Sequence, residues 1–290
     1  MKNRLSCSIL EFSGRSDRAC ADCDPVWNAI QAEALQESQK EPLLHAWLER
    51  SVLRHARIEA SLGHVLGEKL FAEAPKGFQK VFQEAVADEP SIRDAILEDL
   101  QTIRRHDPAT LSYLNPFLHF KGFLALEAHR IAHWLWKRGR TMLAQHIQSH
   151  VSQRFGVDIH PAARLGQGVF IDHATGVVIG QTAVVGDGVV MLHGVTLGSN
   201  GKENGDRHPK VGSGVFIGAG AELLGNIRIG EGARIGAGSV VLSDVPAETT
   251  VVGVPARPVG RSRPASPDRF REPSFVRPAE RPFVASATVS

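Results

Sequence analysis

The C-terminal half of the chain repeats an aliphatic residue every six positions, and glycine usually follows it. A period of six matches neither the 3.6-residue period of an amphipathic helix nor the alternation of a half-buried strand. It is typical of a solenoid of short strands and tight turns, in which the aliphatic residue fills the interior and glycine accommodates the turn. The repeated positions are Ile159, Leu165, Ile171, Ile179, Val185, Met191, Leu197, Val211, Ile217, Leu223, Ile229, Ile235 and Val241.

Small or branched residues recur four positions after the aliphatic ones, as a second mark of the same period. This set comprises Ala163, Val169, Thr175, Ala183, Val189, Val195, Val215, Ala221, Ile227, Ala233 and Ser239. Each hexapeptide then forms one side of a triangular coil, and its short strand pairs in parallel with the coil above. Because a solenoid has to cover its faces, we expect capping and self-association.

Two irregularities interrupt the repeat. A two-residue slip falls between Ile171 and Ile179, at the sequence Asp-His-Ala-Thr-Gly, and a polar loop, SNGKENGDRHPK, occupies residues 199–210. Loops on a rigid scaffold commonly carry function, so both breaks are candidate sites. The alternative is a neutral surface insertion whose charges are solvated.

From Val26 to about Arg154 the apolar residues recur at helical spacing, with Pro42 suited to a first helical turn and Ser91 to an N-cap. We therefore expect a helical domain of six or more helices and the α+β fold class, an all-helical domain followed by a left-handed parallel β-helix. The predicted divisions are a flexible N-terminal arm (1–24), the helical domain (25–155), the β-helix (156–260) and a disordered proline- and arginine-rich tail (261–290).

Composition excludes several classes of function. The sequence has no run of ~20 apolar residues for a membrane span, and Met1–Leu10 lack the apolar core of a secretory signal, so we expect a cytoplasmic protein. The net charge is +2 and the tail after Gly260 contributes +3, which leaves the folded body near −1. We expect no nucleic-acid partner and no membrane partner.

The three cysteines, Cys7, Cys20 and Cys23, lie in the N-terminal arm. The Cys20–Cys23 pair has the spacing of half a metal site or of a redox motif. The chain has no second such pair and no surrounding βαβ pattern, which favours free thiols.

Several motifs together resemble the serine O-acetyltransferase family. They are Val26-Trp-Asn-Ala-Ile-Gln-Ala-Glu-Ala, Lys121-Gly-Phe with the later His133-Trp-Leu-Trp, Asp158-Ile-His-Pro-Ala, Asp172-His-Ala-Thr-Gly, Gly205-Asp-Arg-His-Pro-Lys and Gly253-Val-Pro-Ala-Arg. The resemblance covers about Trp27 to Gly260 and therefore both domains. It implies transfer of acetyl from acetyl-CoA to L-serine, the first step of cysteine biosynthesis.

The resemblance also implies roles for individual residues. His173 matches the general base, and a base is needed because an alcohol is a weak nucleophile at neutral pH. Asp158 lies fifteen residues earlier, close to one expected coil, so we expect it to orient His173. The alternative for Asp158 is a turn residue at the exit from the last helix. Asp107 and Asp172 would hold the substrate ammonium group. Arg207 and His208 would hold its carboxylate, with His208 near the reacting centre. Asp107 can equally be a helix terminator in its Asp-Pro sequence.

Acetyl-CoA would lie in a groove between neighbouring solenoids and contact Gly198, Ala219 and Ala237. Lys202, Lys210 or Arg257 could meet its phosphates, and ordinary surface charge is the alternative for all three. We expect neither a tightly bound cofactor nor a metal. The family implies a trimer-based homo-oligomer, with a hexamer expected. It also implies a complex with O-acetylserine sulfhydrylase that uses a C-terminal isoleucine, whereas this chain ends Thr288-Val289-Ser290, so that partner stays open.

Three other functions compete with this interpretation. A hexapeptide O-acetyltransferase could act on another hydroxyl acceptor, such as a sugar or an antibiotic. A hexapeptide zinc carbonic anhydrase would need three converging histidines, and His160, His173, His193 and His208 include no close pair. A regulatory binding protein would act through its tail.

Overall fold

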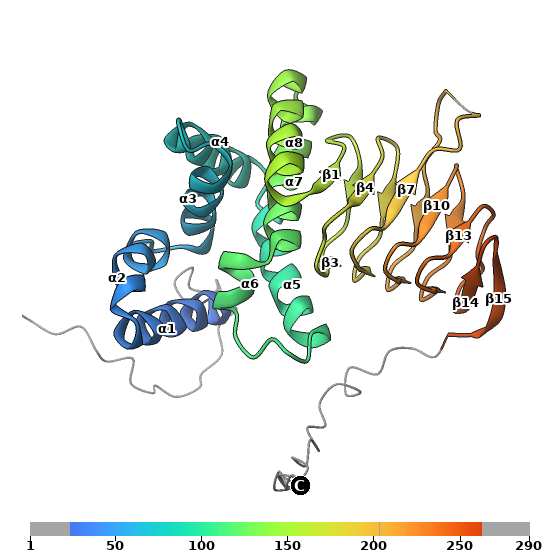
Figure 1. The fold of residues 1–290 in the computed structure, drawn as a ribbon. Coiled ribbons are helices and arrows are strands. Elements are labelled where there is room, and N and C mark those ends of the chain that lie inside the picture. The colour runs from blue at the N-terminus through green and yellow to red at the C-terminus, as the bar shows by residue number, and fades with distance from the viewer. Residues whose placement is uncertain (1–23, 203, 263–290) are drawn as a thin grey trace, which may run out of the picture.

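The computed structural model describes residues 24–202 and 204–262, in which a helical region precedes a parallel β-solenoid (Figure 1). This order confirms the predicted fold class. The three cysteines and the tail from residue 263 lie outside the described residues. The helical elements are α1 (Pro25–Lys40), α2 (Pro42–Leu48), the π-helical turn η1 (Glu49–Leu53), α3 (Ile58–Leu70), α4 (Pro75–Asp88), α5 (Ser91–His106), α6 (Leu114–His119), α7 (Lys121–Lys137) and α8 (Thr141–Phe155).

The strands stack into three sheets, one for each side of the coil. Sheet A has the order β1-β4-β7-β10-β13, sheet B has β11-β8-β5-β2, and sheet C has β15-β14-β12-β9-β6-β3. All pairs are parallel except β14 with β15. The strands are β1 (Val157–Ile159), β2 (Arg164–Leu165), β3 (Phe170–Ile171), β4 (Val177–Ile179), β5 (Val184–Val185), β6 (Val190–Met191), β7 (Thr196–Gly198), β8 (Lys210–Val211), β9 (Phe216–Ile217), β10 (Glu222–Leu224), β11 (Arg228–Ile229), β12 (Arg234–Ile235), β13 (Val240–Val241), β14 (Thr249–Gly253) and β15 (Ala256–Arg261).

The predicted aliphatic positions fill the interior of the solenoid, where all but the partly buried Leu165 are buried. The small or branched residues of the second set are buried as well, except Thr175, which is exposed while Ala174 is fully buried. The reason is the two-residue slip, which lengthens the first coil and shifts the inward position by one residue.

Two details of the helical prediction are also wrong. Ser91 is the first residue of α5 rather than its cap, because Pro90 takes the capping position without a side-chain hydrogen bond. Leu43 is one of the apolar residues that recur at helical spacing between Val26 and Arg154, which predicts burial, but it is 90% exposed. Pro42 does lie in the first turn of α2 as predicted. None of the described helices is long and apolar enough to cross a membrane.

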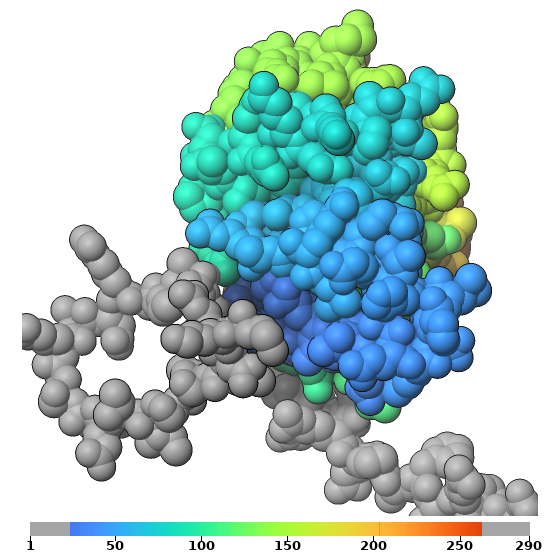
Figure 2. Space-filling view, turned by 90° about the vertical axis from the view of Figure 1, so that its left-hand side faces the viewer, coloured from blue at the N-terminus to red at the C-terminus, as the bar shows by residue number. Residues whose placement is uncertain are grey.

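The helical region lies against the first coil through α7 and α8 (Figure 1). Figure 2 views the molecule from the helical side, where the helices fill most of the visible face and little of the solenoid shows. Contact is closest at Gly122, near the start of α7. A Cβ built there would lie 2.0 Å from the Ile171 carbonyl oxygen and 3.1 Å from the Ala174 Cβ. Glycine therefore lets α7 approach the first break of the repeat.

A buried charge cluster joins α5, α7 and the first coil. Arg130 contacts the Asp99 carboxylate and donates a hydrogen bond to the Gly166 carbonyl at 2.9 Å, while Asp99 accepts one from the Val169 N–H at 2.8 Å. Glu127 lies in the same cluster, with its Oε2 atom 3.4 Å from Arg130 Nε, and burial raises the pKa of its carboxyl well above the usual range. Removing one partner of such a pair is strongly destabilising, so the cluster fixes α5 on the solenoid.

We predict that Gly122→Ala separates α7 from the first coil, because the added methyl overlaps backbone atoms rather than a movable side chain. Overpacking of this kind costs about 1–3 kcal/mol of unfolding free energy. Chemical denaturation of wild type and variant measures the loss. Gly77→Ala in α4 is the matched control, because its methyl meets nothing within 4 Å. Equal stability of the two variants would contradict the prediction.

Candidate functional site

The candidate residues gather at two corners of the solenoid, one on each side of sheet A. The turns from sheet C into sheet A form what we call the C–A corner, which holds residues 172–176 between β3 and β4. The turns from sheet A into sheet B form the A–B corner. It holds His160 after β1, Thr182 after β4, and the loop between β7 and β8, whose described residues 199–202 and 204–209 project from the solenoid in Figure 1.

The C–A corner bends sharply at His173. His173 and Ala174 both have a φ of 56°, a left-handed conformation that costs non-glycine residues on the order of 1 kcal/mol or more each. Tight hydrogen bonds span the bend, from the Ala174 N–H to the Asp172 carbonyl and from the Thr175 N–H to the His173 carbonyl. The bend directs Ala174 into the interior and leaves the His173 side chain 75% exposed. The predicted general base is therefore accessible to a substrate.

Asp107, Asp172 and His173 line one cavity of about 600 Å³. The two predicted ammonium-binding residues therefore lie near the predicted base. The Asp172 Oδ2 atom lies 3.6 Å from the His173 Nε2 atom. Asp107 follows α5 and accepts hydrogen bonds from the Ala109 N–H, at 2.9 Å, and from the Thr110 hydroxyl. Asp107 is thus both the helix terminator and a wall of the cavity.

Lys121 also lines this cavity, and sequence reasoning gave it no role. Its Nζ donates to the Thr175 hydroxyl and links the start of α7 to the C–A corner. His193 lies on the next coil of the same corner, where its ring is 6.1 Å from the His173 ring in an edge-on arrangement. It too had no assigned role. The two residues are 54 and 20 positions from their partners, so proximity along the chain gave no signal.

The expected contact of Asp158 with His173 does not form within this chain, and the spacing argument for it is wrong. The first coil takes twenty residues. In the pairing of β1 with β4, Asp158 therefore lies opposite Val178 and not opposite His173. The Asp158 carboxylate instead accepts a hydrogen bond from Gln148 Nε2 on α8 at 2.6 Å. It also raises the pKa of His160, against the larger lowering that burial causes. Asp158 therefore belongs with the A–B corner.

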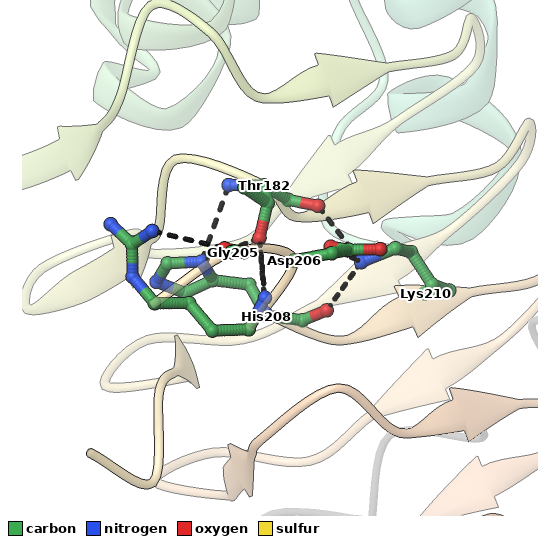
Figure 3. A network of polar contacts seen from close by, with 6 residues as sticks. Thr182, Gly205, Asp206, His208 and Lys210 are labelled. Atoms are coloured by element: carbon green, nitrogen blue, oxygen red, sulfur yellow. Dashed lines mark hydrogen bonds and ion pairs between the residues drawn. The ribbon is translucent and has the colours of Figure 1, made fainter. Parts of the chain in front are cut away.

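Residues of the preceding coil hold Arg207 and His208 at the A–B corner. Figure 3 shows His208 beside Thr182. The Arg207 guanidinium donates to Gln181 Oε1 at 2.9 Å, and the Arg207 N–H donates to the Thr182 hydroxyl oxygen at 3.0 Å. His208 is buried, and its ring covers Gly180, where a Cβ would lie 2.0 Å from both Cδ2 and Nε2. The predicted carboxylate-binding pair is thus built into the scaffold.

Burial lowers the pKa of His208 below its ordinary value. The positive charges of Arg207, Lys210 and His160 lower it further, while Asp206 opposes them. His208 is therefore neutral at physiological pH, with one ring nitrogen free to accept a hydrogen bond and the other carrying a proton.

The two corners do not form one site within a single chain. The cavity at the C–A corner is lined by Asp107, Asp172 and His173, but not by Arg207 or His208. Sheet A lies between the two clusters. Of the predicted residues, one chain brings together Asp107, Asp172 and His173 at the C–A corner, and separately Arg207 and His208 at the A–B corner. Asp158 acts on His160 of the A–B corner.

The predicted coenzyme contacts are divided in the same way. Ala219 and Ala237 lie on successive coils of the C–A corner, because the Gly220 and Gly238 N–H groups donate to His193 and Ala219. Gly198 ends β7 on the other side of sheet A, and Arg257 lies in β15 at the far end of the solenoid.

Of the basic residues proposed for phosphates, Lys202 is exposed in the loop, whereas Lys210 is already bonded to the Thr182 and His208 carbonyls and to Asp206. Lys210 is therefore a structural residue of the A–B corner. Within residues 24–202 and 204–262, no three His, Cys, Asp or Glu side chains are grouped to hold a metal ion.

Comparison with known proteins matches both regions of the chain. A family model described as "Serine acetyltransferase, N-terminal" matches residues 26–128, and one described as "Bacterial transferase hexapeptide (six repeats)" matches residues 208–243. The serine acetyltransferase of Escherichia coli strain K12 is 46% identical over 259 residues, 89% of this chain and 95% of that protein. Serine acetyltransferase 2 of Arabidopsis thaliana is 50% identical over 236 residues, 81% of this chain and 73% of that protein.

Solved structures match the same arrangement of helices and solenoid. A serine acetyltransferase from Brucella abortus in complex with coenzyme A has a TM-score of 0.82 at 46% identity, and the match covers 83% of this chain and 97% of that one. Soybean serine acetyltransferase complexed with serine has a TM-score of 0.79 at 52% identity, covering 81% of this chain and 97% of that one.

We predict that Gly180→Ala displaces the His208 ring, since the added methyl would overlap the imidazole. The ring can move only by leaving its hydrogen bonds, so we expect a loss of about 1–3 kcal/mol in stability. Differential scanning calorimetry and a crystal structure of the variant measure both effects. Gly260→Ala in β15, with nothing within 4 Å of its methyl, is the control. An undisplaced ring in the Gly180 variant would refute the packing argument.

Proposed function

As this chain belongs to the serine acetyltransferase family, we propose that it transfers the acetyl group of acetyl-CoA to the hydroxyl oxygen of L-serine. The chain is an acyltransferase by that membership. The observation that carries the choice of substrate is the charge arrangement, with carboxylates on one corner and a guanidinium on the other. A free amino acid has the complementary ammonium and carboxylate groups. A sugar acceptor would have neither.

His173 is the proposed general base. It removes the proton of the serine hydroxyl as the oxygen attacks the thioester carbonyl, with both substrates bound together. The carbon–sulfur bond then breaks, and the protonated His173 returns its proton to the thiolate of coenzyme A. The exposure of the His173 side chain and its place 3.6 Å from the Asp172 carboxylate, where the substrate ammonium group would bind, support this role. Donors at the site would stabilise the oxyanion.

We further propose that each complete site lies between two copies of the chain. The support is that the ammonium-binding residues and the carboxylate-binding residues lie on different corners of one solenoid. A symmetric ring of solenoids would bring the C–A corner of one copy to the A–B corner of the next, as a head-to-tail interface requires. Asp158 belongs to the A–B group, so it can orient His173 only as a residue of the neighbouring copy.

Acetyl-CoA is the proposed co-substrate, consistent with the coenzyme A complex of the Brucella abortus protein. Ala219 and Ala237 lie along the same corner as His173, which supports a path for the coenzyme arm along that corner. We propose O-acetylserine formation as the first step of cysteine biosynthesis. The cytoplasmic location, the hexamer, the absence of a tightly bound cofactor and the sulfhydrylase complex stay predictions.

We predict that thiol release from acetyl-CoA depends on L-serine and that His173→Ala lowers kcat by about 10²–10⁴-fold, the usual contribution of a general base. A colorimetric thiol assay measures the release, and His146→Ala on the exposed face of α8 serves as the histidine control. Serine-dependent release that survives the His173 change would keep the substrate and refute the base. No serine-dependent release from folded wild type would point to another hydroxyl acceptor.

A mixing experiment tests whether the site is shared between copies. Homogeneous His173→Ala and His208→Ala proteins should each be nearly inactive. Hybrids formed by co-expression should regain about a quarter of wild-type activity, because one interface in four then combines two intact halves in a randomly mixed ring. Proteins purified separately and mixed without unfolding provide the control. Co-expressed hybrids as inactive as their parents would show that each site lies within one chain.

A further inference from the structure

Thr182 contacts both predicted carboxylate-binding residues, although no motif singled it out. Its hydroxyl oxygen accepts hydrogen bonds from the N–H groups of Arg207, at 3.0 Å, and His208, at 3.1 Å. The same oxygen lies 2.9 Å from the His208 Nδ1 atom, and the Thr182 N–H donates to that Nδ1 atom at 3.2 Å. Its carbonyl accepts from Lys210 Nζ at 3.0 Å. Figure 3 shows Thr182 at the centre of this network.

These contacts determine which nitrogen of His208 carries the proton. A threonine hydroxyl offers two acceptor lone pairs and one hydrogen. The Arg207 and His208 N–H groups occupy both lone pairs, so the hydroxyl can act toward Nδ1 only as a donor. The Thr182 N–H is a donor in any case. Two donors directed at Nδ1 require it to be unprotonated, and the proton of the neutral ring must then be on Nε2.

We propose that Thr182 is a positioning residue for substrate binding, which holds His208 in the tautomer whose Nε2 presents a hydrogen-bond donor. This inference rests on the proposed function, because the acceptor would be an oxygen of the serine substrate. Among the described residues, Nε2 has no hydrogen-bond partner, and it is not one of the atoms closed off from solvent. The group that His208 offers to a ligand is therefore an N–H, and proton removal is left to His173.

The surrounding charges are consistent with a neutral His208. Arg207, Lys210 and His160 all disfavour a second proton on the ring, and the Asp206 carboxylate is the group that favours one. The hydrogen bond from Lys210 is the largest cause that lowers the pKa of Asp206, and the Thr182 hydroxyl lowers it further, so Asp206 competes with Nδ1 for the hydroxyl hydrogen. Lys210 Nζ holds the Asp206 carboxylate at 2.5 Å. Even if Asp206 took the hydroxyl hydrogen, the Thr182 N–H would still donate to Nδ1.

Thr182→Val tests the proposal, because valine has nearly the same shape but no hydroxyl. It leaves the Arg207 and His208 N–H groups without their acceptor and removes one donor from Nδ1. We expect the KM for serine to rise about tenfold or more, and the KM for acetyl-CoA to change less than about twofold. Thr182→Ser, which keeps the hydroxyl, should restore the wild-type value. Thr250→Val on β14 is the matched control.

A second measurement does not depend on activity. Nitrogen-15 NMR of the full-length protein labelled at histidine distinguishes the two neutral tautomers, and the His208 signals are assigned by their loss in His208→Gln. We expect wild type to show an unprotonated Nδ1 and a protonated Nε2, and Thr182→Val to show both tautomers.

The outcomes separate this inference from the proposed function. An unchanged KM for serine in Thr182→Val, or a protonated Nδ1 in wild type, would overturn the role of Thr182. Thr182→Val could instead raise both KM values equally and lower the melting temperature, with Thr182→Ser restoring neither. Thr182 would then be a structural residue only, and its proposed role in substrate binding would be overturned. Wild type without serine-dependent release, but with the predicted NMR signals, would overturn the substrate and leave the tautomer assignment standing.

Discussion

The structure depends on one constraint, that strands of two or three residues have no partner within their own coil. Each backbone group must bond to the coil above or below, so successive coils follow the same path. Val178 pairs with Thr196 and Glu222 with Val240, eighteen residues on in both cases. Inserted residues cannot be accommodated within the sheets, so they lie in the turns at the corners. The two insertions in this chain lie there, and each forms one half of the candidate site.

This constraint explains what the sequence could and could not predict. The period of six predicts which residues fill the interior of the solenoid. It also locates the two breaks, because any segment that departs from the period cannot stack in register with the next coil. The partners of the functional residues do not follow. Thr182 lies 26 positions before His208, and only the stacking of coils brings the two together. The Asp158 prediction failed because it assumed a coil length that the first break changes.

The helical region contributes to the site through its attachment to the first coil. Asp107 ends α5, and α5 is held on the solenoid by the buried Asp99–Arg130 contact. Gly122 brings α7 against the turn that carries His173. The sequence indicated Asp107 as a helix terminator, which is a local property. Its place in the cavity depends on contacts between segments 36 and 70 residues apart, which no local pattern encodes.

The two ends of the solenoid differ from its sides. At the N-terminal end α7 and α8 cover the first coil, and at the other end β15 runs antiparallel to β14 and closes sheet C. As the outermost strand, β15 contains Pro258, which lacks an N–H group, and the charged Arg257 and Arg261. Proline and charge on an edge strand oppose the addition of further strands. A further strand is therefore opposed at the open edge of sheet C, and the helices cover the opposite end, so this chain resists lengthening its solenoid by strand addition at these two places.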